Sequence, residues 1–337
     1  MKTLNVVFSS KDTVDVRSEP VPDLREGQIL IQSQRSLIST GTECICLQQK
    51  FVPGTHWHEW VRYPFYPGYS NVGRVIEVGA GVSGFRIGQR VATREGHRHY
   101  VAADAASAIP VPDKVSDEDA TFFALGNIVQ IGVRAAEHTM GDSVVIIGLG
   151  LLGQLAVQYT RLMGAREIIA IDTSVTRLEL ARNNGATTTL NMSAEAAREH
   201  VLELTGGRLA DVVYDITGHP AVFPMALKLA RNFGKVVLLG DAGNPSEQRL
   251  TADIIVRGLR IVGAHDRHAP AGVSEYTYWT KANMAALFFS YIQRRQMNIG
   301  ALVSHRYSPQ DAPKAYEMLL KDRATAMGVI FDWSQLD

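Results

Sequence analysis

The sequence predicts a two-domain α/β protein, in which a β-rich part precedes a parallel sheet covered by helices on both faces. The chain has 337 residues, enough for two domains of ordinary size. Its first 110 residues contain short runs of alternating apolar and polar residues separated by turns. From about residue 117, apolar strands alternate with amphipathic helices, which is the pattern of a parallel sheet.

The β-rich part is predicted from the period-two alternation and from the residues that interrupt it. Glycine, proline and aspartate cluster at residues 20–23 and 79–81, where they mark turns. Few helical patterns occur here, which favours a barrel or a sandwich. The predicted strands are Thr3–Phe8, Gln28–Ser33, Gly73–Val78, Arg90–Thr93 and His99–Val101.

The second part begins with a helix predicted over Asp117–Ala136, after which strands and helices take turns. The tail adds helices near 280–294 and 309–322, and it ends with a strand over Ala326–Phe331. The alternating region has predicted strands at 143–147, 167–171, 211–214, 235–239 and near 260–264, and predicted helices at 151–163, 175–184 and 220–232.

Charge and composition exclude several classes of protein. Lysine plus arginine and aspartate plus glutamate both number 34, so nothing in the charge balance favours nucleic acid or an anionic membrane as a partner. Apolar runs such as Val144–Ile147 are far shorter than the ~20 residues of a membrane span. The chain opens on a strand-like run without a signal peptide, and its two cysteines, Cys44 and Cys46, suit neither a disulfide framework nor a CxxC site. We expect a soluble, cytoplasmic protein.

The strongest chemical signal is a glycine-rich turn between a strand and a helix. Residues 143–153 read SVVIIGLGLLG, a GxGxxG pattern formed by Gly148, Gly150 and Gly153. The first glycine permits the tight turn, the second lets a pyrophosphate approach the backbone, and the third lets the helix pack closely on the strand. The start of the helix supplies amide donors and a positive dipole for phosphate. The pattern predicts dinucleotide binding.

An acidic residue at the end of the next strand favours NAD over NADP. Asp172 follows the strand Glu167–Ile171 and lies 19 residues after Gly153. A carboxylate there accepts hydrogen bonds from the ribose hydroxyls and repels a 2′-phosphate. Thr173 adds no positive charge, although Arg177, one turn into the following helix, is a cation that favours the opposite choice.

Two later strand ends are expected to complete the cofactor site. Asp215–Gly218 and Leu238–Asp241 each follow a predicted strand, and the carboxyl ends of parallel strands form the ligand crevice of an open α/β sheet. Ordinary turns between strand and helix are the alternative interpretation. The residues predicted to bind the cofactor are Gly148, Gly150, Leu151, Leu152, Gly153, Asp172, Thr173, Arg177, Thr217, Gly218, Leu239, Gly240 and Asp241.

The order of these motifs resembles that of the medium-chain dehydrogenase/reductase superfamily. Residues 67–79 resemble the family's glycine-rich segment entering a barrel strand, and residues 84–91 resemble its "GD-V" turn, with Gln89 in place of the acid. Residues 142–153 match its nucleotide loop. The likeness extends over essentially the whole chain.

This resemblance implies a fold of two domains and an oxidoreductase activity. A GroES-like catalytic domain is expected over residues 1–126 and 267–337, and a Rossmann domain, a doubly wound parallel sheet, over residues 127–266. In this family the last strands of two Rossmann sheets often pair, so the run Arg260–Ala264 suggests a homodimer.

The positions that hold zinc in many members of the family differ here. Thr40-Gly41-Thr42-Glu43 stands in place of a cysteine motif, and Gly68-Tyr69-Ser70 stands in place of Gly-His-Glu. The third ligand falls near Gly126–Asn127, and two cysteines are too few for a four-cysteine lobe. A catalytic zinc needs three converging nitrogen, sulfur or carboxylate donors, so we expect no metal. Residues 36–43 resemble a zinc-less subgroup that includes bacteriochlorophyllide dehydrogenase-like proteins.

Without a metal, hydrogen-bond donors and a base must stabilise and deprotonate the alcohol. Thr42 stands where the family places a hydroxyl that touches the substrate oxygen, and Tyr69 occupies the vacated metal position. Glu43 is expected to orient its neighbours, and the imidazole of His58 or His56 is the candidate base. A turn threonine and a packing tyrosine are the alternative interpretations of the first two.

Substrate contacts are predicted from polar and aromatic clusters. Residues 56–66 concentrate aromatic rings, two histidines and an arginine, which suit a sugar ring or an anionic group. A surface loop or a dimer contact explains this segment equally well. The predicted substrate residues are His56, Trp57, Arg62, Arg94, His97, Asn127 and His265.

The sequence therefore predicts reversible, NAD-dependent and metal-free oxidation of a secondary alcohol in a small molecule, with a polyol, sugar or cyclitol derivative as the preferred substrate. Three alternatives remain open. One is reduction of a quinone or enone, and another is oxidation of a tetrapyrrole side-chain alcohol. The third is a dinucleotide-binding sensor without catalysis.

Overall fold

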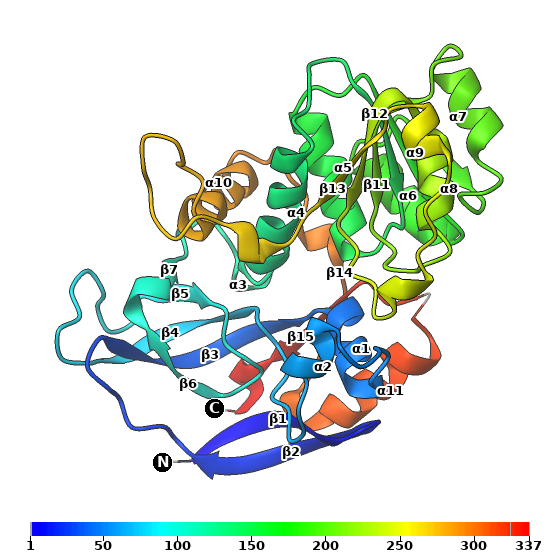
Figure 1. The fold of residues 1–337 in the computed structure, drawn as a ribbon. Helices are drawn as coiled ribbons and strands as arrows, with labels where there is room; N and C mark the ends of the chain where they lie inside the picture. Colours follow the sequence, from blue (N-terminus) through cyan, green and yellow to red (C-terminus); the bar gives the residue numbers. More distant parts are fainter. Residues whose placement is uncertain (1, 324, 337) are drawn as a thin grey trace. The chain divides into compact units, whose positions relative to one another are not determined.

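The computed structural model describes residues 2–323 and 325–336, which form two compact units (Figure 1). Unit 1 comprises Met1–Leu125 and Lys281–Asp337, and unit 2 comprises Gly126–Thr280. Residues 267–280, which we assigned to the catalytic domain, group with unit 2. One reason is the contact of Trp279, whose ring centroid lies 3.5 Å from the guanidinium carbon of Arg134.

Unit 1 is built on a seven-stranded sheet and a separate antiparallel pair (Figure 1). The main sheet has the order β14-β15-β3-β4-β5-β7, and β6 also pairs with β3. The strand expected at the end of the chain forms β15 and pairs antiparallel with β3. The strands are β1 (Lys2–Ser10), β2 (Thr13–Pro20), β3 (Gln28–Ile38), β4 (Asn71–Val78), β5 (Arg90–Thr93), β6 (Tyr100–Asp104), β7 (Ile109–Pro110), β14 (Val303–Tyr307) and β15 (Gly328–Asp332).

Two helices follow β3 in a region where the sequence predicted loops. They are α1 (Thr40–Gln48) and α2 (His56–Trp60). The Glu43 carboxylate accepts a hydrogen bond from the Ser39 amide at 2.7 Å, which satisfies one of the donors left open at the start of α1. The helix thereby fixes the segment that replaces the zinc motif.

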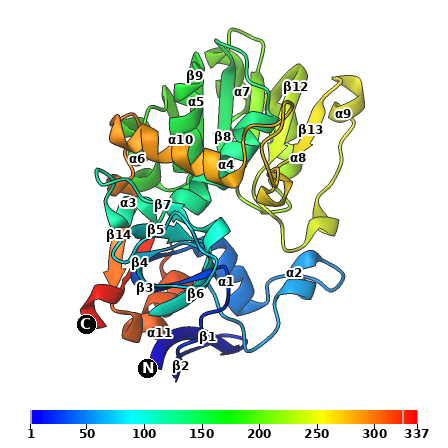
Figure 2. The ribbon, with the colours of Figure 1, turned by 90° about the vertical axis from the view of Figure 1, so that its left-hand side faces the viewer.

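Unit 2 is a parallel sheet with the strand order β10-β9-β8-β11-β12-β13 (Figure 2). This is the Rossmann order, in which the chain starts in the middle, winds outward and then reverses. The helices α5 (Leu151–Leu162) and α6 (Val175–Asn183) pack beside β8 to β10. On the other half of the sheet, α8 (Phe223–Leu229) packs beside β11 and β12, and α7 (Arg198–Leu204) and α9 (Asp253–Val256) pack against α8. The strands are β8 (Ser143–Ile147), β9 (Glu167–Asp172), β10 (Thr188–Asn191), β11 (Ala210–Asp215), β12 (Ala230–Leu238) and β13 (Arg260–Gly263).

Several predicted boundaries shift in the structure. The helix expected over 117–136 divides into α3 (Asp117–Ala120) and α4 (Phe123–Ala135). The helix expected over 220–232 ends at Leu229, because Ala230 already pairs with Ala210 in the sheet. Six further elements that are short or weakly patterned were not predicted, namely β2, β7, β10, β14, α7 and α9. The last two helices along the chain are α10 (Lys281–Gln293) and α11 (Ala312–Lys321).

Two features of the fold concern association with a second chain and with a membrane. β13 is the last strand at one edge of its sheet among the described residues, and Ile261 on it is 39% exposed. The homodimer expected through this edge stays a prediction. Within residues 2–323 and 325–336, every helix is too short or too polar to cross a bilayer.

Candidate active site

The glycine turn of unit 2 has three different environments for its three glycines. Gly148 has φ +91°, and a Cβ there would lie 2.9 Å from the Thr217 Cγ2. A Cβ on Gly153 would lie 2.1 Å from the Gly148 carbonyl oxygen, so only glycine permits this approach of α5 to β8. Gly150, the N-cap of α5, has nothing within 4 Å of such a Cβ. The backbone at Gly150 therefore faces open space.

The open space lies at the start of α5, a helix of 12 residues with free amides in its first turn. Leu151 is buried and Leu152 is half-buried, so these two residues offer a ligand their backbone amides rather than their side chains. Together with the positive end of the helix dipole, this arrangement fits the pyrophosphate of a dinucleotide.

The Asp172 carboxylate at the end of β9 connects to the glycine turn. Its Oδ2 accepts a hydrogen bond from the Leu149 amide at 2.7 Å, and its Oδ1 accepts one from the Ser174 amide at 2.9 Å. Each carboxylate oxygen has a second lone pair, so the group retains acceptor capacity for ribose hydroxyls. Thr173 beside it is exposed, and the Arg177 carbonyl accepts a hydrogen bond from the Gln154 side chain at 2.8 Å.

The loops after β11 and β12 meet at the same end of the sheet. A Cβ on Gly240 would lie 2.4 Å from the Gly218 amide nitrogen, so the two backbones are in direct contact. The Thr217 hydroxyl donates to the Asp215 carboxylate at 2.7 Å and is held in place. Leu239 is buried and points toward Gly132 of α4, so its side chain belongs to the core.

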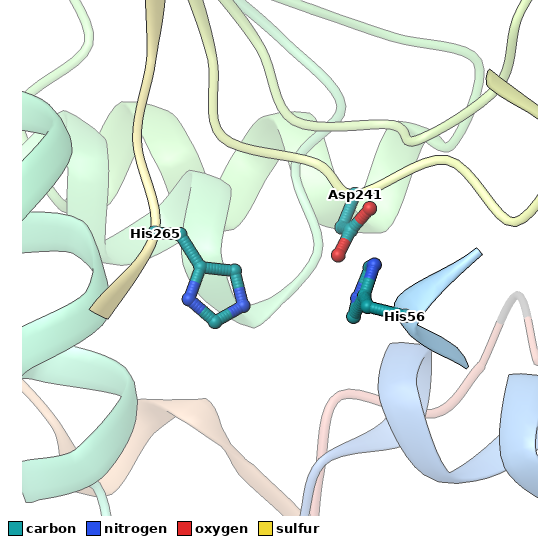
Figure 3. A group of neighbouring side chains, drawn as sticks. All are labelled: His56, Asp241 and His265. Atoms are coloured by element: carbon teal, nitrogen blue, oxygen red, sulfur yellow. The ribbon is translucent and has the colours of Figure 1, made fainter. Parts of the chain in front are cut away.

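Asp241 and His265 follow β12 and β13 at this end of the sheet (Figure 3). One oxygen of Asp241 and one ring nitrogen of His265 lie within 4.8 Å of each other. The His265 Nδ1 accepts a hydrogen bond from the Arg267 amide at 3.1 Å. Figure 3 also draws His56, which belongs to unit 1. A carboxylate and one imidazole are too few ligands for a zinc site in unit 2.

In unit 1, three hydroxyl groups lie together between the start of α1 and the approach to β4. The Tyr69 hydroxyl lies 2.5 Å from the Ser39 Oγ and 3.4 Å from the Thr42 Oγ1. The guanidinium carbon of Arg94 lies 5.1 Å from the centroid of the Tyr69 ring. Burial raises the pKa of Tyr69, so its hydroxyl is protonated at neutral pH and can donate a hydrogen bond.

A buried polar network lies next to these hydroxyls. The Glu43 Oε2 lies 3.0 Å from the His97 Nε2 and accepts a hydrogen bond from the Tyr316 hydroxyl at 2.5 Å. The His97 Nδ1 lies 2.8 Å from the Ser36 Oγ, which also accepts a hydrogen bond from the Trp333 indole at 2.8 Å. Glu43 and His97 are each 1% exposed, so this network is shielded from solvent.

This network differs from one expectation, and it includes residues that the sequence did not predict. We expected His97 to contact substrate, but it is buried and both of its ring nitrogens have partners. It holds Glu43, which in turn holds the start of α1. Ser36, Tyr316 and Trp333 were not among the candidates, because Tyr316 and Trp333 lie almost 300 residues further along the chain.

Other predicted substrate residues fall in different environments. Trp57 is 4% exposed and belongs to the apolar core of unit 1, so it is a packing residue. Asn127 is fully buried on α4. His58 and Arg62 are exposed, and the ring of His58 forms no hydrogen bond or ion pair with a described residue. The structure therefore brings Thr42 and Tyr69 together but does not connect His58 to them.

The residues near α1 do not fit a catalytic zinc. Thr40 and Tyr69 stand at positions that, by the family resemblance, correspond to two of the ligands, and both carry neutral hydroxyl groups. Burial raises the pKa of the Cys44 thiol to about 11, and it raises the pKa of Cys46 as well. Protonated thiols are poor metal ligands. Glu43 and His97 are already engaged with each other.

Comparison with known proteins agrees with this fold. A model of the alcohol dehydrogenase GroES-like domain matches residues 26–113, and a model of zinc-binding dehydrogenases matches residues 152–276. Together the two matches span more than half of the chain. The chain belongs to the medium-chain dehydrogenase/reductase family. The predicted combination of a GroES-like domain and a Rossmann domain is confirmed.

Relatives of this medium-chain dehydrogenase/reductase include enzymes that are named for different alcohol substrates. L-threonine 3-dehydrogenase of Burkholderia vietnamiensis is 28% identical, and the match covers 93% of this chain and 94% of the relative. The structure of galactitol-1-phosphate dehydrogenase from Escherichia coli has a TM-score of 0.83 at 20% identity, covering 98% and 100% of the two chains. A putative zinc-binding dehydrogenase from Sinorhizobium meliloti bound to NADP has a TM-score of 0.81 at 22% identity, covering 98% and 99%. At these identities, the structures show a shared fold.

Proposed function

We propose that this medium-chain dehydrogenase oxidises a secondary alcohol to a ketone, reversibly, with NAD and without catalytic zinc. The proposal is carried by the Tyr69 hydroxyl, which stands in the position of a zinc ligand and lies close to the hydroxyls of Ser39 and Thr42. A hydroxyl group at this position gives the substrate oxygen a hydrogen-bond donor in place of a Lewis acid.

The side chains around Tyr69 have separate roles in this reaction. Tyr69 donates a hydrogen bond to the substrate oxygen, and the hydroxyls of Thr42 and Ser39 pass the alcohol proton on to solvent water. The positive charge of Arg94, close to the Tyr69 ring, lowers the free energy of negative charge developing on these oxygens. Glu43 fixes the start of α1 and is a positioning residue. A nicotinamide bound at the glycine turn supplies the hydride acceptor.

We propose a polyol, a sugar or a cyclitol derivative as substrate. Among the relatives, the threonine and galactitol-1-phosphate dehydrogenases are named for substrates that carry hydroxyl groups. In unit 1, Arg94 offers charge near Tyr69, and the exposed Arg62 and half-buried His56 offer polar groups on the segment before β4. These groups suit a ligand with several hydroxyls or with one acidic group.

The direct test is turnover over a panel of polyols, sugars and cyclitols, followed by NADH absorbance. We expect activity on one class that survives extended treatment with a strong chelator, because none of the proposed steps uses a metal. Elemental analysis of the purified protein should show far less than one zinc per chain. Loss of activity with chelator and recovery on adding zinc would contradict the proposal.

The choice between NAD and NADP is tested at Asp172. The substitution Asp172→Asn retains an oxygen for the Leu149 amide but removes the negative charge that repels a 2′-phosphate. We expect the ratio of kcat/KM for NAD to that for NADP to fall at least tenfold. Glu179→Gln is a matched control, since it removes an exposed negative charge from α6, the helix that follows Asp172. An unchanged ratio in Asp172→Asn would show that another residue sets the preference.

A further inference from the structure

Unit 2 contains a hollow that the proposed reaction does not use. It has a volume of about 730 Å³, which is within the usual range for sites that bind small molecules. Its walls come from α7, the turn before β11, the end of α8, the start of β12, and α9 with the residue that follows it. Five cationic side chains line it, namely Arg198, Arg208, Lys228, Arg231 and Arg257.

The positive charge of this basic pocket exceeds the negative charge beside it. Asp211 pairs with both Arg208 and Arg231, with distances of 3.4 Å and 2.5 Å. Asp253 pairs with Arg257 at 3.2 Å, and Glu199 pairs with Arg198 at 2.6 Å.

Three carboxylates thus pair with the cations of the basic pocket, which number five. The pocket keeps an excess of two positive charges, although the formal net charge of the chain is zero. Lys228 forms no ion pair within 4 Å among the described residues, and it lies on the rim as an exposed side chain. The Arg208 side chain is 61% exposed and that of Arg198 is 43% exposed. Donors for a ligand are therefore accessible.

The basic pocket lies at the opposite end of the sheet from the glycine turn. It is bordered by residues at the starts of β11 and β12, whereas the loops with Gly218 and Gly240 follow the ends of these strands. β11 runs over the six residues Ala210–Asp215, so the two ends are about 17 Å apart at ~3.3 Å per residue. A dinucleotide at the glycine turn would leave this pocket open.

We propose that the basic pocket binds a small molecule bearing a phosphate or pyrophosphate group. Guanidinium groups bind phosphate oxygens through paired N–H donors, and an ammonium group adds a point charge. The side-chain amide of Asn232 on the pocket wall provides a further neutral donor. The excess of two positive charges matches the charge of a phosphate monoester, which is close to two at neutral pH.

The test is calorimetric titration of the full chain with inorganic pyrophosphate, in the presence of 1 mM NADH so that the glycine turn is occupied. The double variant Arg208→Gln/Lys228→Gln removes the two most exposed charges and should weaken binding at least tenfold. Arg260→Gln is the control, because this arginine of unit 2 is 63% exposed and lies outside the pocket lining. It should bind pyrophosphate as the parent protein does.

Two results would overturn the proposal. One is equal affinity of the parent protein and the double variant, which would place the anion elsewhere, including at the glycine turn. The other is a similar loss in Arg260→Gln, or no saturable binding up to 10 mM, because either would indicate only diffuse attraction of an anion to surface charge. Melting temperatures of all three proteins, measured without ligand, establish that the substitutions leave the fold intact.

Discussion

Replacement of Tyr69 by phenylalanine is expected to lower kcat by about 10²–10³-fold, the range typical for loss of one hydrogen-bond donor to the reacting oxygen. The substitution keeps the ring and its contact with Arg94 but removes the hydroxyl that lies 2.5 Å from Ser39 and 3.4 Å from Thr42. Affinity for NADH, measured by fluorescence, should not change, since the glycine turn belongs to unit 2. Steady-state kinetics on the best alcohol of the panel gives the effect.

Tyr63→Phe is the matched control for this experiment. Tyr63 is also in unit 1, but its hydroxyl bonds to the backbone carbonyls of Cys46, at 2.8 Å, and Leu47, at 3.1 Å, rather than to the hydroxyl cluster. Its kcat should remain within twofold of the parent value. If Tyr69→Phe also retained its kcat, the hydroxyl cluster would not be the reaction centre.

Replacement of Glu43 by alanine is expected to reduce the free energy of unfolding by about 3–5 kcal/mol. The carboxylate is 1% exposed and is the acceptor for the Ser39 amide and the Tyr316 hydroxyl, and it lies 3.0 Å from the His97 Nε2. Without it, these buried groups have no partner and no access to water. Denaturant unfolding, followed by tryptophan fluorescence, to which the buried Trp333 contributes, measures the loss.

Two further variants distinguish a specific network from general sensitivity to charge removal. Glu43→Gln retains one acceptor oxygen and should lose less stability than Glu43→Ala, with a lower kcat because α1 is held less firmly. Glu317→Ala removes an exposed carboxylate on α11 whose one ion pair among the described residues is with Lys321, and its unfolding midpoint should equal that of the parent protein. An unfolding midpoint of Glu43→Ala that equals that of the parent protein would show that the network does not stabilise unit 1.

The features that the sequence alone determined depend on local spacing. The GxGxxG turn, the strand before it and the acid at the end of the next strand follow from neighbouring residues, because the turn needs glycine and the helix starts directly after it. The distribution of apolar residues likewise predicted most of the parallel strands, since strands buried on both faces are continuous apolar runs. It failed at α1, whose start depends on Glu43 reaching back to the Ser39 amide.

Only the tertiary structure decided which polar groups meet. His97 and Trp57 stand in clusters that resemble a binding surface, but His97 closes a buried network and Trp57 packs in the core. The partners Tyr316 and Trp333 come from the far end of the chain, where β15 returns to pair with β3. The basic pocket is likewise lined by residues of three separate helices, α7, α8 and α9. A sequence pattern indicates which residues face the core. Contacts between distant segments depend instead on how the elements pack.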